Sequence, residues 1–263
     1  GAMYVEDAYM LLRFLPSLAG ALLAPIIFLL ALELGFDNRV SGLARFLVAI
    51  ENALIVQSRF ILLDSFLLLF GFASLLLYLI YRRSKNLNYF FFDSALAGAA
   101  ASIKWTGLTF IALPLIIELV THWSPRKLLP KKDAMLRAVA FLIAPALLYI
   151  AVFSVHFALL TKSGADDNFM SPAFQRTLAG NQYEHYADLP TADIVSKFTE
   201  LNHVMYTANQ TLTAGHEYGS KWYSWPLMQR GVYYWAGENR YIYLLGNPVI
   251  WWMSTLAVLV AVV

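Results

Sequence analysis

The sequence contains no cysteine and few charged residues. Only 14% of its 263 residues are Asp, Glu, Lys or Arg, against about a quarter in average globular chains. The lack of Cys excludes thiolate metal ligands and thiol nucleophiles. The shortage of charge excludes an ordinary soluble domain, because too few polar side chains remain to coat a surface that faces water. A net charge of +2 gives no reason to expect nucleic acid as a partner.

Hydrophobic residues, by contrast, make up 59% of the chain and occur in long runs. A helix needs roughly 20 apolar residues to cross a bilayer, whose hydrocarbon offers the backbone no hydrogen-bond partner. The sequence therefore predicts an all-α polytopic membrane protein. The predicted spans are 16–34, 43–56, 60–81, two short helices within 90–120 joined by a hairpin at Lys104–Gly107, 134–160, and a last one that begins near Pro248.

These spans give a predicted organisation in three parts. Residues 1–160 form a transmembrane bundle of about six spans, residues 161–246 an external loop with short helices, and residues 247–263 the start of a further span. Lys and Arg concentrate in the connections after the first, third and fifth spans, which places those connections on the cytoplasmic side. Neither end resembles a natural terminus, so we expect an internal piece of a larger protein.

Four ionisable residues gather at the predicted outer edge of the spans. Arg13 begins the first span, Arg59 and Asp64 begin the third, and Lys104 lies in the outer hairpin. One interpretation is that the arginines reach out to lipid headgroups while Asp64 and Lys104 form a structural ion pair. The other is that the cations together bind an anionic group, most naturally a lipid phosphate, for which the arginine fork is well suited.

The predicted external loop is rich in aromatic and polar residues. Tyr and Trp commonly settle at the membrane interface, which explains most of the aromatics. Trp222 and Trp225, near His216, also suit a sugar ring or an acceptor. His185, His203 and His216 lie more than ten positions apart, so their spacing does not support a zinc site. A stretch at 191–205 has the spacing of an amphipathic helix lying on the membrane, with Thr191 as its cap.

Several blocks of sequence, spread over nearly the whole chain, are similar to one known family. They are Tyr9–Pro16, Glu51–Ser65, Ser102–Leu108, Phe169–Gln175, Lys221–Met228 and Tyr241–Pro248. In these blocks the chain resembles the protein O-mannosyltransferases, membrane glycosyltransferases of the GT-C class. The resemblance implies a GT-C helix bundle. It also implies transfer of a mannosyl group, with inversion, from polyprenyl or dolichyl phosphate mannose to Ser or Thr of translocated proteins.

The resemblance also implies roles for particular residues. The catalytic acidic pair of the family lies in an external loop before the span that begins near Arg13, so no catalytic residue is expected here, and Glu6 and Asp7 are not assigned to it. Arg13 is the first choice for binding the donor phosphate, followed by Lys104 and Arg59. Asp64 is expected to hold one of these cations in place.

Further expectations concern the substrates and the surroundings. Acceptor or sugar contacts are predicted for His216, Trp222 and Trp225. No metal or cofactor is required beyond the lipid-linked donor. The expected partners are that donor, a secreted or membrane protein as acceptor, the secretion translocon and membrane lipids. The external loop is too short for the β-trefoil module of eukaryotic members, which indicates a bacterial form in the plasma membrane; a eukaryotic form would lie in the endoplasmic reticulum.

Three other functions remain open. The same cations would line a route in a transporter or flippase of lipid-linked sugars, although inverted repeats and broken helices, which are typical of transporters, are not evident in the sequence. A GT-C transferase with a non-protein acceptor, such as lipid A or a glycan, is a second alternative. A structural membrane subunit is the third, and it leaves the cluster of charges unexplained.

Overall fold

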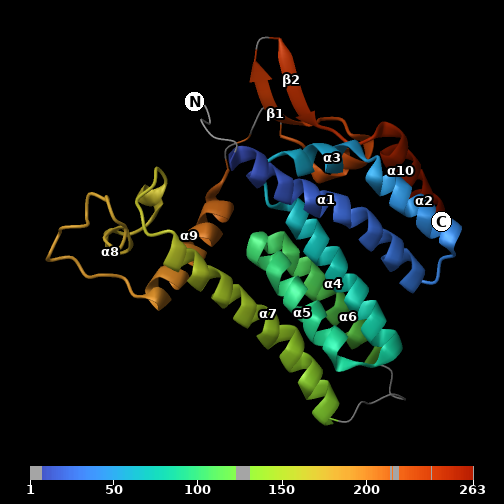
Figure 1. Cartoon of the computed structure of the whole chain (residues 1–263), viewed down its shortest axis with the longest axis horizontal. Helices are drawn as coiled ribbons and strands as arrows, with labels where there is room; N and C mark the ends of the chain where they lie inside the picture. The colour runs from blue at the N-terminus through green and yellow to red at the C-terminus, as the bar shows by residue number, and fades with distance from the viewer. Residues whose placement is uncertain (1–7, 123–130, 214, 216–218, 238, 263) are drawn as a thin grey trace. The chain divides into compact units, whose positions relative to one another are not determined.

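The computed structural model describes residues 8–122, 131–213, 215, 219–237 and 239–262 (Figure 1). The chain divides into two compact units. The first comprises Gly1–Pro145 and His216–Val263, and the second comprises Ala146–Gly215. Each unit is built mainly from helices, and the described residues contain a single two-stranded sheet. The predicted three-part division concerns placement relative to a membrane, and it stays a prediction.

The first unit begins with a long apolar helix and a bent pair of shorter ones. Helix α1 spans Ala8–Glu33, α2 spans Asn38–Ala49 and α3 spans Asn52–Arg59. The Asp37 side chain starts α2 by accepting hydrogen bonds from the free N–H groups of its first turn. Helices α2 and α3 meet at an angle of 51°. The second predicted span is therefore broken in the middle rather than continuous.

The break has a physical cause in the sequence. The Glu51 side chain accepts a hydrogen bond from the backbone N–H of Leu54 at 2.9 Å and so caps the start of α3. A new N-cap at this position requires extended backbone at Glu51, which interrupts the helix. The segment that was expected to form one continuous span is thus two short helices, with the polar residue Glu51 at their junction.

Helices α4 (Asp64–Ser84) and α5 (Leu87–Ile103) form the centre of the first unit. After α5 comes the 3-10 turn η1 (Trp105–Leu108) and then α6 (Thr109–His122). The α-helix is therefore interrupted at Lys104, as the sequence predicted. Tyr78, Tyr81 and Phe90 pack with Phe141 of α7 (Lys131–Leu159) into a buried aromatic core. Among the described helices, three are long and apolar enough to span a membrane, or four if the bent pair counts as one span.

The hairpin around Lys104 is held by a close backbone contact. A Cβ atom on Gly107 would lie 2.4 Å from both the carbonyl carbon and the carbonyl oxygen of Ala100 in α5. Only glycine allows the turn to approach the helix this closely. The N–H of Gly107 donates to the carbonyl of Lys104 at 2.8 Å, which fixes the turn that presents the lysine.

The C-terminal part of the first unit contains the sheet and a last apolar helix. It consists of η3 (Trp222–Leu227), β1 (Val232–Gly237), β2 (Arg240–Leu244) and α10 (Pro248–Val262). The two strands are antiparallel, with Val232 opposite Leu244. They form the hairpin drawn in red in Figure 1.

The second unit contains the C-terminal half of α7, the short turns η2 (Asp167–Phe169) and α8 (Pro172–Gln175), and α9 (Ile194–Thr211). The amphipathic helix expected near 191–205 is thus present, but its cap is Asp193 and not Thr191. Asp193 accepts a hydrogen bond from the Ser196 N–H at 2.7 Å. Asp193 is the residue just before the helix, where a side-chain oxygen can accept from the free N–H groups of the first turn.

Side chains also fix the loop that precedes α9. Asp167 accepts hydrogen bonds from the Ser163 hydroxyl at 2.6 Å and from the Gly164 N–H at 2.8 Å. The Ser163 hydrogen bond is the main reason that the pKa of Asp167 lies below its usual range. Glu200 of α9 accepts from the N–H and the hydroxyl of Ser171, at 2.5 and 2.8 Å. A loop of this length is therefore folded rather than irregular.

Candidate functional site

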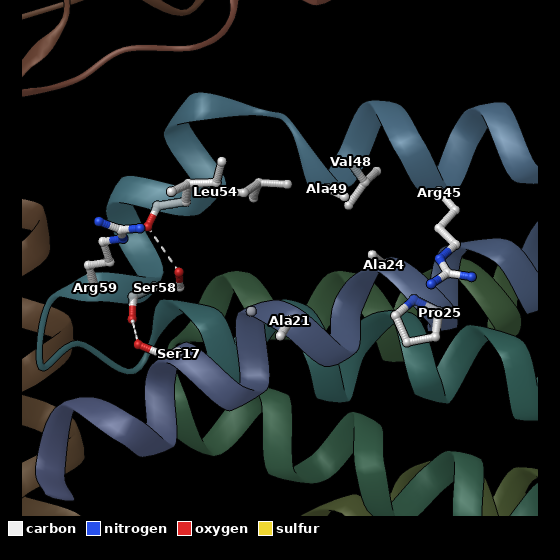
Figure 2. A pocket seen from close by; sticks show the side chains of 12 residues that line it. Ser17, Ala21, Ala24, Pro25, Arg45, Val48, Ala49, Leu54, Ser58 and Arg59 are labelled. Atoms are coloured by element: carbon white, nitrogen blue, oxygen red, sulfur yellow. Dashed lines mark hydrogen bonds between the residues drawn. The ribbon is translucent and has the colours of Figure 1, made fainter.

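Helix α3 separates two cavities in the first unit. The cavity between α3 and α1, which we call the arginine cavity, has a volume of about 530 Å³ (Figure 2). Its lining comprises Ser17, Gly20, Ala21, Ala24, Pro25, Arg45, Val48, Ala49, Leu54, Ile55, Ser58 and Arg59. The cavity on the other side, which we call the lysine cavity, has a volume of about 490 Å³. Its lining comprises Ala53, Leu54, Gln57, Leu62, Asp64, Leu67, Leu68, Lys104, Tyr234 and Leu244.

Close packing of α1 on α3 brings Arg13 of α1 to the end of α3, where Arg59 lines the arginine cavity; Arg13 itself is not a lining residue. A Cβ on Gly20 would lie 2.5 Å from the Cβ of Ser58, so glycine is needed where the helices meet. The Ser17 hydroxyl donates to the Ser58 carbonyl at 3.1 Å, and the Nε of Arg13 donates to the Arg59 carbonyl at 2.9 Å. The side chain of Arg13 therefore reaches the end of α3 that carries Arg59.

Both of these arginines lack a counter-ion within the described part of the chain. The salt bridges found there join Arg83 to Glu33 and Lys104 to Asp64. No Asp or Glu side chain lines the arginine cavity. An unpaired guanidinium at the edge of a membrane span is electrostatically expensive unless it meets an anion or reaches the headgroup region. The arrangement favours binding of an anionic group at this end of the cavity.

The lysine cavity is electrostatically different. The Nζ of Lys104 lies 2.5 Å from Oδ1 of Asp64, and the two side chains are 52% and 22% exposed. The Tyr234 hydroxyl donates to the Oε1 of Gln57, and its ring packs edge-on against Phe60 with centroids 4.9 Å apart. Burial, together with the negative charge of Asp64, raises the pKa of Tyr234, so it remains a neutral hydroxyl.

Glu51 ties α3 to the C-terminal segment. Glu51 is 8% exposed. Its carboxylate accepts hydrogen bonds from the backbone N–H of Asn247 at 2.7 Å and the indole N–H of Trp251 at 3.1 Å, in addition to the bond that caps α3. The Asn52 side chain donates to the Leu245 carbonyl at 2.8 Å. A buried carboxylate satisfied by several N–H groups fixes both partners. Helix α3, which separates the two cavities, is thereby held in place.

The structure divides the cluster of cations that the sequence suggested. Arg13 and Arg59 lie together, whereas Lys104 lines the other cavity and pairs with Asp64. The expectation of one shared group of three cations is therefore corrected. The physical reason is that α3 runs between them, which the order of residues along the chain did not reveal.

The residues proposed for the acceptor side receive no comparable support from the geometry. Trp222 and Trp225 are 76% and 55% exposed, and the Trp225 indole donates to the Ser220 hydroxyl at 3.0 Å. Neither lines the arginine cavity or the lysine cavity. His216 lies outside the described residues. Their roles stay predictions.

Tyr234 and Arg45 line these cavities although neither was predicted to do so. Tyr234 seemed only one of many interfacial aromatics, and nothing in its spacing indicated contact with Gln57. Arg45 was overlooked although it lies within the second predicted span, where a charge is by itself a signal of function. Among the described residues, no three His, Cys, Asp or Glu side chains are grouped so as to hold a metal ion.

Comparison with known proteins decides the family. Residues 1–161 match the model of the dolichyl-phosphate-mannose-protein mannosyltransferases, and residues 194–263 match the C-terminal four-transmembrane region of protein O-mannosyltransferases. The chain belongs to this family. The resemblance seen in the sequence blocks is therefore confirmed, as is the expectation of a helical, multi-pass membrane protein.

Individual relatives agree with this assignment. Protein O-mannosyl-transferase 1 of Rattus norvegicus is 37% identical over 183 residues, which covers 64% of this chain and 24% of the relative. Dolichyl-phosphate-mannose–protein mannosyltransferase 6 of Saccharomyces cerevisiae is 33% identical over 196 residues, which covers 69% of this chain and 26% of the relative. The chain thus matches about a quarter of the length of these curated relatives.

A solved structure shows the same fold. It is the S. cerevisiae protein O-mannosyltransferase Pmt1-Pmt2 complex bound to the sugar donor, which matches with a TM-score of 0.84 over 96% of this chain and 64% of that chain. The sequence identity is 17%. The agreement therefore concerns the backbone arrangement, and it confirms the predicted membrane bundle of GT-C type.

Proposed function

We propose that the protein containing this chain transfers a mannosyl group from polyprenyl or dolichyl phosphate mannose to Ser or Thr of a protein acceptor. Membership of the mannosyltransferase family supports this proposal. The names of the relatives agree, and the structural neighbour is described as bound to the sugar donor. The single observation within this chain that carries the proposal is the pair Arg13 and Arg59, for which the described residues offer no carboxylate partner.

The chemistry of transfer explains why such a pair is useful. When the glycosidic bond breaks, the lipid phosphate leaves with increasing negative charge. Arg13 and Arg59 offer planar donors that bind phosphate oxygens and stabilise this charge. Lys104 is a weaker candidate than the sequence implied, because Asp64 already neutralises its charge.

The acceptor hydroxyl must lose a proton, which requires a general base. The family resemblance predicts that an acidic pair in a preceding external loop does this. Asp64 instead serves to hold Lys104. We propose that the lysine cavity, with the neutral Tyr234 hydroxyl and the Gln57 amide, lies on the sugar or acceptor side of the reaction. The external loop, which is too short for a β-trefoil module, supports a location in a bacterial plasma membrane. The acceptors would be proteins that emerge from the translocon.

The test is mannosyl transfer by the full-length protein in membranes, with polyprenyl phosphate mannose and a Ser/Thr peptide. We expect Arg13→Ala to lower kcat/KM about 100-fold, the usual effect of removing one donor that stabilises a developing anion. Arg39→Ala, which removes an exposed arginine from the first turn of α2, should transfer at the wild-type rate. Equal rates for the two variants would refute the phosphate assignment, and no transfer by the wild type would refute the proposed function.

One observation favours a second function. The α2–α3 pair is a broken helix, a feature that is common in transporters and was not evident in the sequence. A flippase would move the lipid-linked sugar between leaflets of a vesicle without forming a glycosylated peptide. That result would replace the transferase proposal.

A further inference from the structure

Arg45 lies at the end of the arginine cavity away from Arg59. It is seven residues after Asn38, the first residue of α2, or about 10 Å along the helix axis. Figure 2 shows its side chain extending across the cavity toward Pro25 of α1. Because α2 begins at the predicted cytoplasmic side, with Arg39 in its first turn, this end of the cavity faces the predicted cytoplasmic half of the membrane.

The two ends of the cavity are too far apart to share one small anion. Arg45 and Arg59 are 14 positions apart on the two arms of the bent pair. Fourteen residues of helix span roughly 20 Å, and Figure 2 shows the two guanidinium groups at opposite ends. The residues between them are small or apolar, among them Ala24 and Ala49. The spacing suits two separate anionic groups.

Arg45 has no neutralising partner in the described part of the chain. Its side chain forms neither a salt bridge nor a hydrogen bond with a described residue. It nevertheless belongs to a helix pair that passes as a membrane span. A guanidinium in this position costs several kcal/mol unless it meets an anion or extends to the interface.

The neighbouring backbone adds a second polar feature. Pro25 has no N–H group to donate to the carbonyl of Ala21, one helical turn earlier in α1. Ala21 and Pro25 both line the cavity. A ligand here would therefore combine a phosphate for Arg45 with a hydroxyl able to donate to a carbonyl, in apolar surroundings that accept acyl chains.

We propose that the Arg45 end of the arginine cavity binds the phosphate of an anionic membrane phospholipid from the cytoplasmic leaflet. The arginine fork is suited to a phosphate diester, and the small side chains leave room for the glycerol and the start of the acyl chains. The site is distinct from the Arg13–Arg59 end and does not rest on the proposed transferase function. It would anchor the bent pair to the inner leaflet.

The test uses the full-length protein in nanodiscs that contain phosphatidylglycerol and phosphatidylcholine. Native mass spectrometry after mild delipidation counts the phosphatidylglycerol that is retained. We expect Arg45→Gln to lower the fraction carrying one tightly held phosphatidylglycerol at least about tenfold, which corresponds to about 1.4 kcal/mol. Arg39→Gln, the matched control on the same helix, should retain the lipid as the wild type does.

Competition experiments distinguish the phospholipid from other phosphate-containing ligands that could bind Arg45. Excess inorganic phosphate should leave the lipid bound, and so should polyprenyl phosphate mannose. Displacement by free phosphate would overturn the lipid assignment, and one-for-one displacement by the donor would make this end part of the donor site. If Arg45→Gln retains as much phosphatidylglycerol as the wild type, Arg45 only extends toward the headgroups and the proposed site is refuted. If Arg45→Gln does not fold, Arg45→Lys should retain less lipid than the wild type, and equal retention would refute the role of the fork.

Discussion

The two sides of α3 carry similar cations in different electrostatic states. On the α1 side, Arg13 and Arg59 meet no carboxylate among the described residues, whereas on the other side Lys104 lies 2.5 Å from Asp64. A cation neutralised within the protein contributes mainly to structure, because little of its field remains for a ligand. A cation without an internal partner keeps its charge for a substrate. Under the function we propose, this difference favours the α1 side of α3 for the anionic part of the donor.

The contrast depends on how closely the elements pack. Gly20 allows α1 to approach α3, and Gly107 allows the η1 turn to approach α5. The first contact places Arg13 beside Arg59 and the second presents Lys104 to Asp64. Glu51 holds α3 between them. Variants of these residues test whether the two sides differ as proposed.

The largest effect is expected on the α1 side of α3, where Arg59 should be as sensitive as Arg13. Arg59→Ala should lower kcat/KM for mannosyl transfer about 100-fold. Arg59→Lys should lower it about tenfold, because a lysine keeps the charge but loses the two-pronged donor geometry. The measurement is the initial rate with the full-length protein in membranes at varied donor concentration, with Arg39→Ala as control. A loss of less than twofold in Arg59→Ala would end the distinction between the two sides.

The second prediction concerns Glu51, which holds α3 between the two cavities. The Glu51 carboxylate accepts from three N–H groups, and Glu51→Ala leaves all three without this acceptor. The free energy of unfolding should fall by about 3 kcal/mol, since each unsatisfied buried donor costs about 1–3 kcal/mol. Glu51→Gln should lie between this variant and the wild type, because an amide oxygen still accepts. Thermal unfolding in detergent micelles measures both. Asp188→Ala, an exposed acidic residue of the other unit, should shift the transition little; an equal shift would refute the role of Glu51.

The smallest effect is expected on the lysine side. A double-mutant cycle of Asp64→Asn and Lys104→Met should give a coupling free energy below about 1 kcal/mol, because the pair is partly exposed. Lys104→Met should lower kcat/KM less than about fivefold, in keeping with a charge that is already neutralised. A loss as large as that of Arg59→Ala would show that Lys104 binds the phosphate itself and would reverse the comparison.

Some features of the site were accessible from the sequence because they depend on local patterns. Apolar runs indicated the spans, and the polar residues at Lys104–Gly107 indicated the break between α5 and α6. The break at Glu51 was missed, since an acidic residue inside an apolar run does not by itself reveal that it will cap a new helix. The contacts of Glu51 with Asn247 and Trp251 join residues almost 200 positions apart, and no spacing rule covers such distances.

Composition and the order of apolar runs determined, from the sequence alone, that this chain is a helical membrane protein, and its sequence blocks determined the family. These properties follow from hydrophobicity and local backbone preference, which each segment carries with it. Only the tertiary structure decided that Arg13 joins Arg59, that Lys104 pairs with Asp64, and that Arg45 opens onto the same cavity. Those relations depend on which faces of the helices pack together, and that choice is made by many contacts at once.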